Sequence, residues 1–130
     1  MSIPVNARVR ATPNFLACLN AARAFMADQD ATSAPSRFRK LQGELTKARR
    51  MLAFLPTSGR PARFLDARAP RGRFQAERAK VLATALGMPE LREFVIGTYV
   101  LLYAHSQSEV VLLSLRHERQ LQYGLQDFGD

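Results

Sequence analysis

The chain has few of the residues that metal sites and disulfide frameworks need. Its 130 residues include one cysteine, Cys18, and two histidines. A lone cysteine excludes a disulfide framework and a cysteine-rich zinc site, and two histidines without a cysteine pair argue against a structural metal. Cys18 lies near Phe15 and Leu19 at helical spacing, so we interpret it as a small buried hydrophobe. We expect neither a metal ion nor a cofactor.

Long apolar runs and processing signals are also absent. No apolar stretch reaches the roughly 18 residues of a transmembrane helix, and Met1 to Arg10 lacks the basic-then-apolar layout of a signal peptide. A hydrophobic fraction of 47% against 23% charged residues is ordinary for a globular protein. The length fits one domain over residues 1–130. We therefore expect a cytoplasmic protein that does not contact membranes.

Acidic residues are scarce beside basic ones. Eleven Asp and Glu stand against 19 Lys and Arg, a formal net charge of +8. The first 80 residues hold 16 of the basic and 5 of the acidic residues, and the densest basic stretch runs from Arg60 to Lys80. This balance indicates a polyanionic or acidic partner, although a solvated basic face explains the run equally well.

The first half of the chain predicts a strand followed by two helices. Apolar and polar residues alternate over 5–12, with Val5, Ala7, Val9 and Ala11 on the apolar side, which is typical of a strand with one buried face. Thr12-Pro13 then has the form of a helix start, and the helical pattern ends near 28–31. A second amphipathic helix begins near 33–35 with an apolar stripe from 38 to 55, and the short connection predicts an antiparallel hairpin.

The middle of the chain is irregular before it becomes helical again. Residues 56–61 break the second helix. We expect a short strand at 63–65, a loop over 66–72 and a helix over 74–86, which Gly87 and Pro89 end. The apolar residues of that helix are Phe74, Val81, Leu82, Ala85 and Leu86.

The last third predicts three short strands at 91–96, 99–104 and 110–115. Their tight connections are typical of an antiparallel meander, in which Tyr99 and Tyr103 face the same side and pack in the core or at its rim. The fold class is therefore α+β: an N-terminal strand, a helical hairpin packed on one face of a small antiparallel sheet, and a helical insertion before the meander.

One cluster could carry chemistry, because the chain has no glycine-rich phosphate loop, nucleophile elbow or metal-spaced histidine pair. Arg116-His117-Glu118-Arg119 ends the last strand, and Tyr123 follows four residues later. Histidine titrates near neutrality, arginine stabilises an anionic phosphate and tyrosine can orient or donate. On residue chemistry alone, a polar strand end that caps the sheet edge is the better explanation.

A family resemblance adds to this reading. LREFVIGTYVLLY at 91–103, followed by EVVLLSLRH at 109–117, resembles the RelE/ParE superfamily of bacterial type II toxin–antitoxin toxins, or plasmid stabilisation proteins. RHERQLQY at 116–123 looks like the "RHxREAGY" ending of ParE-like members, and the break at 56–60 resembles the family's "P..GR". The strand and hairpin match in order, whereas about 66–88 looks like an insertion. The acidic tail at 126–130 matches no feature of the family.

The resemblance implies a growth-inhibiting toxin, bound by a cognate antitoxin in a hetero-oligomer. ParE-like members poison DNA gyrase, and RelE-like members are ribosome-dependent mRNA endoribonucleases. Nucleases of the second kind carry an arginine between the two tyrosines of the third strand, where this chain has Val100. Arg119 and Tyr123 do match their C-terminal Arg and Tyr, with His117 as the acid or base. We favour the gyrase inhibitor; the nuclease and a degenerate toxin that only binds antitoxin are the alternatives.

The basic excess then predicts where partners bind. We expect an acidic antitoxin tail to lie along the helical hairpin and the sheet edge, covering basic side chains. The residues predicted to contact the target or the antitoxin are Arg39, Lys47, Arg50, Arg60, Arg63 and Arg116.

Overall fold

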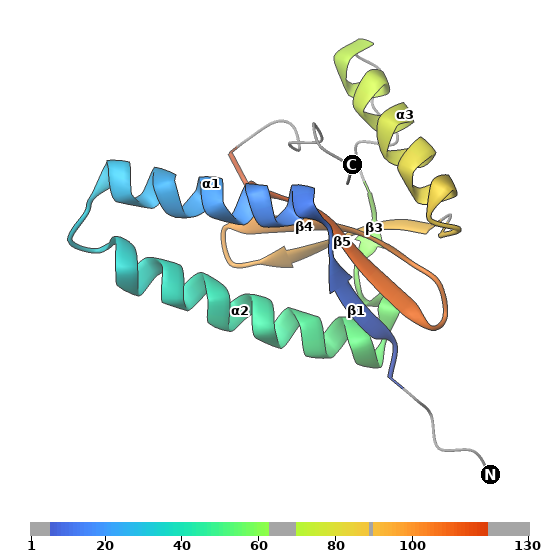
Figure 1. Ribbon diagram of the computed structural model, residues 1–130, viewed down its shortest axis with the longest axis horizontal. Helices are drawn as coiled ribbons and strands as arrows, with labels where there is room; N and C mark the ends of the chain where they lie inside the picture. The colour runs from blue at the N-terminus through green and yellow to red at the C-terminus, as the bar shows by residue number, and fades with distance from the viewer. Residues whose placement is uncertain (1–5, 63–69, 89, 120–130) are drawn as a thin grey trace.

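The computed structural model describes residues 6–62, 70–88 and 90–119. Three helices and five strands lie in this part of the chain, which confirms the α+β class (Figure 1). In chain order they are β1 (Arg8–Ala11), α1 (Pro13–Gln29), α2 (Ala34–Phe54), β2 (Arg60–Pro61), α3 (Pro70–Ala85), β3 (Glu90–Ile96), β4 (Tyr99–His105) and β5 (Glu109–His117), with a 3₁₀ turn at Pro56–Ser58. No helix among the described residues is long and apolar enough to cross a membrane.

The five strands form one mixed sheet with the order β1-β5-β4-β3-β2. Strands β3, β4 and β5 make the predicted antiparallel meander, with Leu91 opposite Ala104 and Leu101 opposite Leu115. β1 runs parallel to β5, so the prediction of a purely antiparallel sheet is wrong. Parallel pairing needs a long connection in place of a tight turn, and the helical hairpin and the rest of the sheet supply it.

Helices cover both faces of this sheet. The α1–α2 hairpin packs on the face to which Tyr99, Leu101 and Tyr103 contribute, as the spacing of the two tyrosines predicts. Helix α3 packs on the other face, where Val100 and Leu102 lie (Figure 1). Every residue of β4 is buried as a result. The core is therefore two apolar layers separated by the sheet.

The helix starts follow their local sequence, with one correction in the middle of the chain. The Thr12 hydroxyl caps α1 by accepting from the Phe15 N–H at 3.1 Å, and Pro13 occupies the first turn.

Helix α3 already begins at Pro70, so the loop predicted over 66–72 is wrong in its last three residues. The strand predicted at 63–65 lies outside the described residues, and the short strand observed is β2, just before it.

Helix α3 contacts the sheet through small residues. Ala79 and Ala83 are completely buried, with Leu82 and Leu86 partly buried beside them. Val81, one of the apolar residues of the predicted helix, is 66% exposed. Alanine has the highest helix propensity and lets the helix backbone approach the sheet closely. Because alanine is only weakly hydrophobic, the buried face of α3 is hard to recognise in the sequence.

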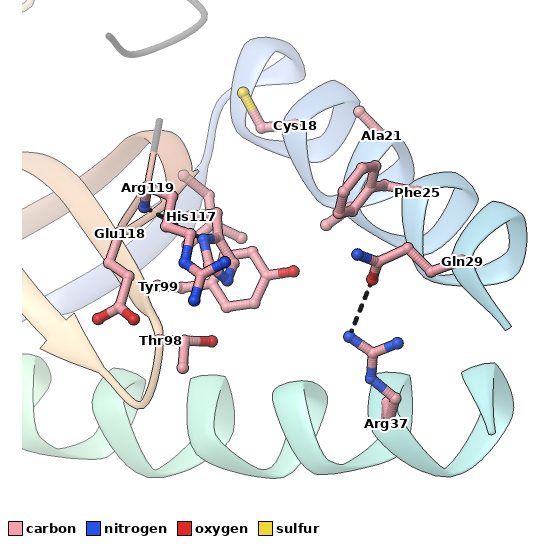
Figure 2. Close-up of a pocket in the computed structure, with 12 residues that line it drawn as sticks. Cys18, Ala21, Phe25, Gln29, Arg37, Thr98, Tyr99, His117, Glu118 and Arg119 are labelled. Carbon is pink, nitrogen blue, oxygen red and sulfur yellow. Dashed lines mark hydrogen bonds between the residues drawn. The ribbon is translucent and has the colours of Figure 1, made fainter. Parts of the chain in front are cut away.

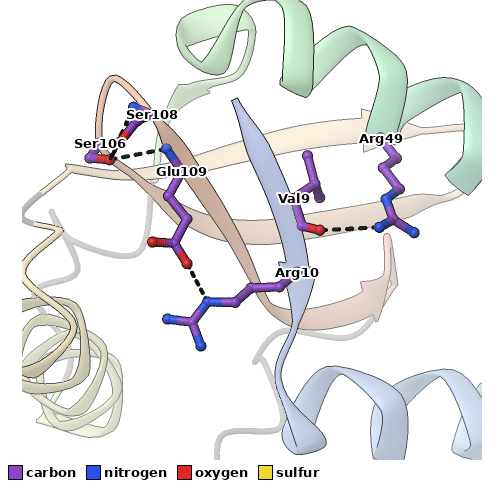
Figure 3. Close-up of polar contacts among 6 residues, drawn as sticks. All are labelled: Val9, Arg10, Arg49, Ser106, Ser108 and Glu109. Atoms are coloured by element: carbon purple, nitrogen blue, oxygen red, sulfur yellow. Dashed lines mark hydrogen bonds and ion pairs between the residues drawn. The ribbon is translucent and has the colours of Figure 1, made fainter. Parts of the chain in front are cut away.

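Strand β1 is held at the sheet edge by contacts on both sides. Its Arg10 guanidinium pairs with the Glu109 carboxylate of β5, and the Arg49 guanidinium of α2 donates to the Val9 carbonyl at 3.1 Å (Figure 3). The Ala7 N–H donates to the Ala53 carbonyl at 2.8 Å. Ala7 is buried and Val9 partly buried, as predicted, whereas Ala11 is exposed. These contacts join β1 to the end of α2.

The Tyr103 hydroxyl joins the end of α2 to the sheet. It donates to the Pro56 carbonyl at 2.7 Å and accepts from the Gly59 N–H at 2.9 Å. A Cβ on Gly59 would lie 2.6 Å from this hydroxyl, so only glycine fits there. Burial raises the pKa of Tyr103, which therefore stays a neutral donor at physiological pH.

Replacing Tyr103 with phenylalanine should lower the free energy of unfolding by about 1–3 kcal/mol, because the buried Gly59 N–H and the partly buried Pro56 carbonyl lose their partner. Tyr99→Phe is the matched control. No described residue hydrogen-bonds the Tyr99 hydroxyl, so its loss should change stability by under about 0.5 kcal/mol. Urea unfolding monitored by circular dichroism measures both variants, and equal losses in the two would contradict the role of Tyr103.

Candidate functional site

A pocket of about 740 Å³ opens between the helical hairpin and the end of β5. One wall comes from α1 and α2 and includes Phe25, Gln29 and Arg37; the other comes from the β3–β4 turn and the end of β5 (Figure 2). The remaining lining residues are Cys18, Ala21, Ala22, Thr98, Tyr99, Leu115, His117, Glu118 and Arg119. Two of the residues singled out as candidate catalytic groups, His117 and Arg119, therefore line one pocket.

His117 is positioned by an aromatic contact and a backbone hydrogen bond. Its ring lies edge-on to the Tyr99 ring, with centroids 5.3 Å apart. Its Nδ1 accepts from the Arg119 N–H at 3.1 Å. A neutral ring that accepts at Nδ1 carries its proton on Nε2. The geometry thus selects one tautomer of a side chain that could exchange a proton.

Tyr99 presents a neutral hydroxyl to the pocket. Only 8% of the residue is exposed, and its hydroxyl points into the open space (Figure 2). Burial raises the pKa of this hydroxyl, and the Arg37 charge acts in the opposite direction. The group is therefore a hydrogen-bond donor at neutral pH. The sequence predicts that Tyr99 packs in the core or at the rim of the core. In the structure its ring is buried as predicted, and its hydroxyl points into the pocket.

Arg116 does not join His117, although the two are adjacent in sequence. Strand alternation puts Arg116 on the α3 side of the sheet, opposite Val100. There its Nη2 lies 4.0 Å from a Glu93 carboxylate oxygen, and the Arg60 Nε lies 3.5 Å from the other oxygen. The Arg60 Nε is buried and makes no hydrogen bond, so its contact with Glu93 is an ion pair. The sequence cluster is divided between two faces.

Glu93 is the centre of this second cluster. Only 2% of it is exposed, and it lies on the central part of β3 between two cations from β2 and β5. A carboxylate that deep in the sheet needs paired cations to offset its desolvation. Sequence reasoning missed the role of Glu93; the signal was an acid at a central position of the predicted strand at 91–96.

The remaining candidates differ in what surrounds them. Arg39, Lys47 and Arg50 are all exposed on α2, and the Arg39 Nε donates to the Pro35 carbonyl at 3.4 Å. They form a basic surface on the hairpin but do not line the pocket. Arg63 and Tyr123 lie outside the described residues.

Sequence reasoning also missed three pocket residues. Arg37 and Gln29 face each other from α2 and α1, with the Arg37 Nη2 donating to the Gln29 Oε1 at 3.2 Å. Phe25 is 55% exposed at the rim. On the sequence these are ordinary polar and apolar helix positions, and only the packing of the hairpin against β5 brings them to one cavity.

The chain matches no model of a known protein family and no curated protein. Within the part of the chain that the structure describes, no three His, Cys, Asp or Glu residues are grouped so as to hold a metal ion.

Glu93→Gln should lower the free energy of unfolding by about 1–3 kcal/mol, because it leaves two partly buried guanidinium groups without their counter-charge. The matched control is Glu109→Gln, which removes the carboxylate of the exposed pair with Arg10 and should cost under about 1 kcal/mol. Thermal and urea unfolding of both variants check this. A larger loss in Glu109→Gln than in Glu93→Gln would refute the central role of the buried carboxylate.

Proposed function

We propose that this chain is the toxin of a type II toxin–antitoxin system, acting as a ParE-like inhibitor of DNA gyrase that a cognate antitoxin neutralises. The resemblance of residues 91–123 to the RelE/ParE superfamily is the basis of the proposal. The order of elements supports it: a strand, a helical hairpin and a three-strand meander follow one another, and the last strand ends at His117.

The surroundings of Val100 carry the choice of gyrase over the ribosome. RelE-like nucleases need an arginine at this place, where its charge stabilises the phosphate in the transition state. Val100 is 4% exposed and packs in the apolar layer under α3. Its neighbour on β5, Arg116, pairs with Glu93. A phosphate at Val100 would meet buried apolar side chains in place of a cation, which favours the non-nucleolytic class.

One observation keeps the nuclease as a second candidate. His117 and Arg119 meet Tyr99 in a single pocket, so a proton-transfer group, a cation and a hydroxyl are close together. This set could act on a phosphodiester without an arginine at position 100. It lies on the hairpin side of the sheet, away from Val100.

A pair of assays separates the two functions. We expect the purified protein to block supercoiling by gyrase or to accumulate cleaved DNA, and to leave mRNA intact on programmed ribosomes. His117→Ala should keep the gyrase effect, because no proton transfer is needed there. Cleavage of ribosome-bound mRNA that His117→Ala abolishes would overturn the gyrase proposal in favour of the nuclease. Loss of both activities with intact antitoxin binding would identify a degenerate toxin.

The basic surface of α2 is our proposed docking site for the acidic part of the antitoxin. The triple variant Arg39→Ala, Lys47→Ala and Arg50→Ala should weaken antitoxin binding at least about tenfold at low salt, and less as salt rises.

Its control is a triple variant with the same change in charge on other elements, namely Arg8→Ala, Arg78→Ala and Lys80→Ala, which are all exposed. Titration calorimetry with the product of an adjoining open reading frame measures both at several salt concentrations. Equal losses in the two triple variants would mean that only net charge matters, and the proposed surface would be wrong.

A further inference from the structure

The pocket between the hairpin and β5 has two guanidinium groups on facing walls. Arg37 extends from α2, where the hydrogen bond to Gln29 holds its guanidinium at the wall. Arg119 follows the end of β5 on the other side, and its backbone N–H is tied to His117 (Figure 2). The pocket lining contains one carboxylate, that of the exposed Glu118. Two guanidinium groups with this spare positive charge suit an anion, and their planar forks match phosphate oxygens.

A hydrogen-bond donor on a largely buried residue points into the same space. The Tyr99 hydroxyl opens into the cavity, and no described residue supplies it with a hydrogen bond. Tyr99 as a whole residue is more than nine-tenths buried. A hydroxyl at the open edge of a buried ring, with no hydrogen bond from a described residue, is left for water or a ligand to satisfy. The donor therefore marks where a polar group of a ligand would bind.

The α1 wall of the pocket is apolar beyond Gln29 and carries an exposed ring. Phe25 is 55% exposed on α1, next to the small side chains of Ala21 and Ala22 that leave room beside it. An aromatic face of this kind binds a flat heterocycle by stacking, whichever base is present. A volume of about 740 Å³ lies within the range of small-ligand sites.

We propose that this pocket binds a nucleoside phosphate, with the base stacked on Phe25 and the phosphate between Arg37 and Arg119. Tyr99 donates to the phosphate or the ribose. The site would accept the ligand as a free nucleotide or as the 5′-phosphorylated end of an RNA, which share this chemistry. The inference rests on the pocket alone and does not depend on gyrase inhibition.

Titration calorimetry with AMP, GMP, CMP and UMP tests the site in the full chain. We expect saturable binding of at least one of them, weakened about tenfold by Arg37→Gln or by Arg119→Gln, since each loses a charge-assisted hydrogen bond. Tyr99→Phe should weaken it about fivefold through loss of a neutral hydrogen bond. Adenosine and inorganic phosphate should each bind at least about tenfold more weakly than the corresponding nucleotide, because each makes only half of the contacts.

Arg8→Gln is the matched control, with the same change in charge on an exposed residue of β1 outside the pocket. It should leave nucleotide affinity unchanged. The site would be refuted by the absence of saturable binding up to about 5 mM nucleotide, by an equal loss in Arg8→Gln, or by inorganic phosphate binding as tightly as the nucleotides.

A short RNA with or without a 5′-phosphate distinguishes the two sources. Tighter binding of the phosphorylated RNA than of a mononucleotide assigns the site to RNA ends, and the reverse assigns it to free nucleotides. These titrations contain neither gyrase nor ribosomes, so a failure to bind nucleotides would not bear on the proposed toxin function. A failure to inhibit gyrase would likewise not bear on nucleotide binding.

Discussion

The central strand β4 is buried along its whole length, and the rest of the fold depends on covering both of its faces. A strand with apolar residues on both sides cannot leave either side in water without losing the free energy of burying them. The helical hairpin covers one side and α3 covers the other. Helix α3 thus closes the second apolar layer of the core, most of whose buried residues lie on the strands. Its contact through Ala79 and Ala83 lets it lie close to the sheet.

The same sheet separates the polar chemistry into two places. Side chains alternate along a strand, so Arg116 and His117 point to opposite faces despite being neighbours. On the α3 face, Arg116 and Arg60 are needed to neutralise the buried Glu93. On the hairpin face, His117 meets Tyr99 beside an open pocket. The cations of the α3 face serve stability, whereas Arg37 and Arg119 belong to the lining of the pocket on the hairpin face.

This division bears on what the protein can do. The place at which a RelE-like nuclease would carry its arginine belongs to the apolar layer under α3, which favours our proposal of a gyrase inhibitor. The pocket is on the other side of the sheet and has two guanidinium groups, those of Arg37 and Arg119, in its lining. The exposed cations of α2 form another surface, separate from the pocket lining, that suits an acidic partner. The pocket and the basic face of α2 are therefore two chemically different surfaces.

The sequence by itself determined the local structure. The Thr12-Pro13 start of α1, the bounds of α2 within a residue or two and the three strands of the meander all follow from capping, periodicity and turn residues that act over a few positions. Only the tertiary structure decided the parallel pairing of β1 with β5, the buried face of α3 and the grouping of Arg37 with Tyr99 and His117. These features join residues far apart in the chain, and their energies come from packing between elements, which local sequence patterns do not encode.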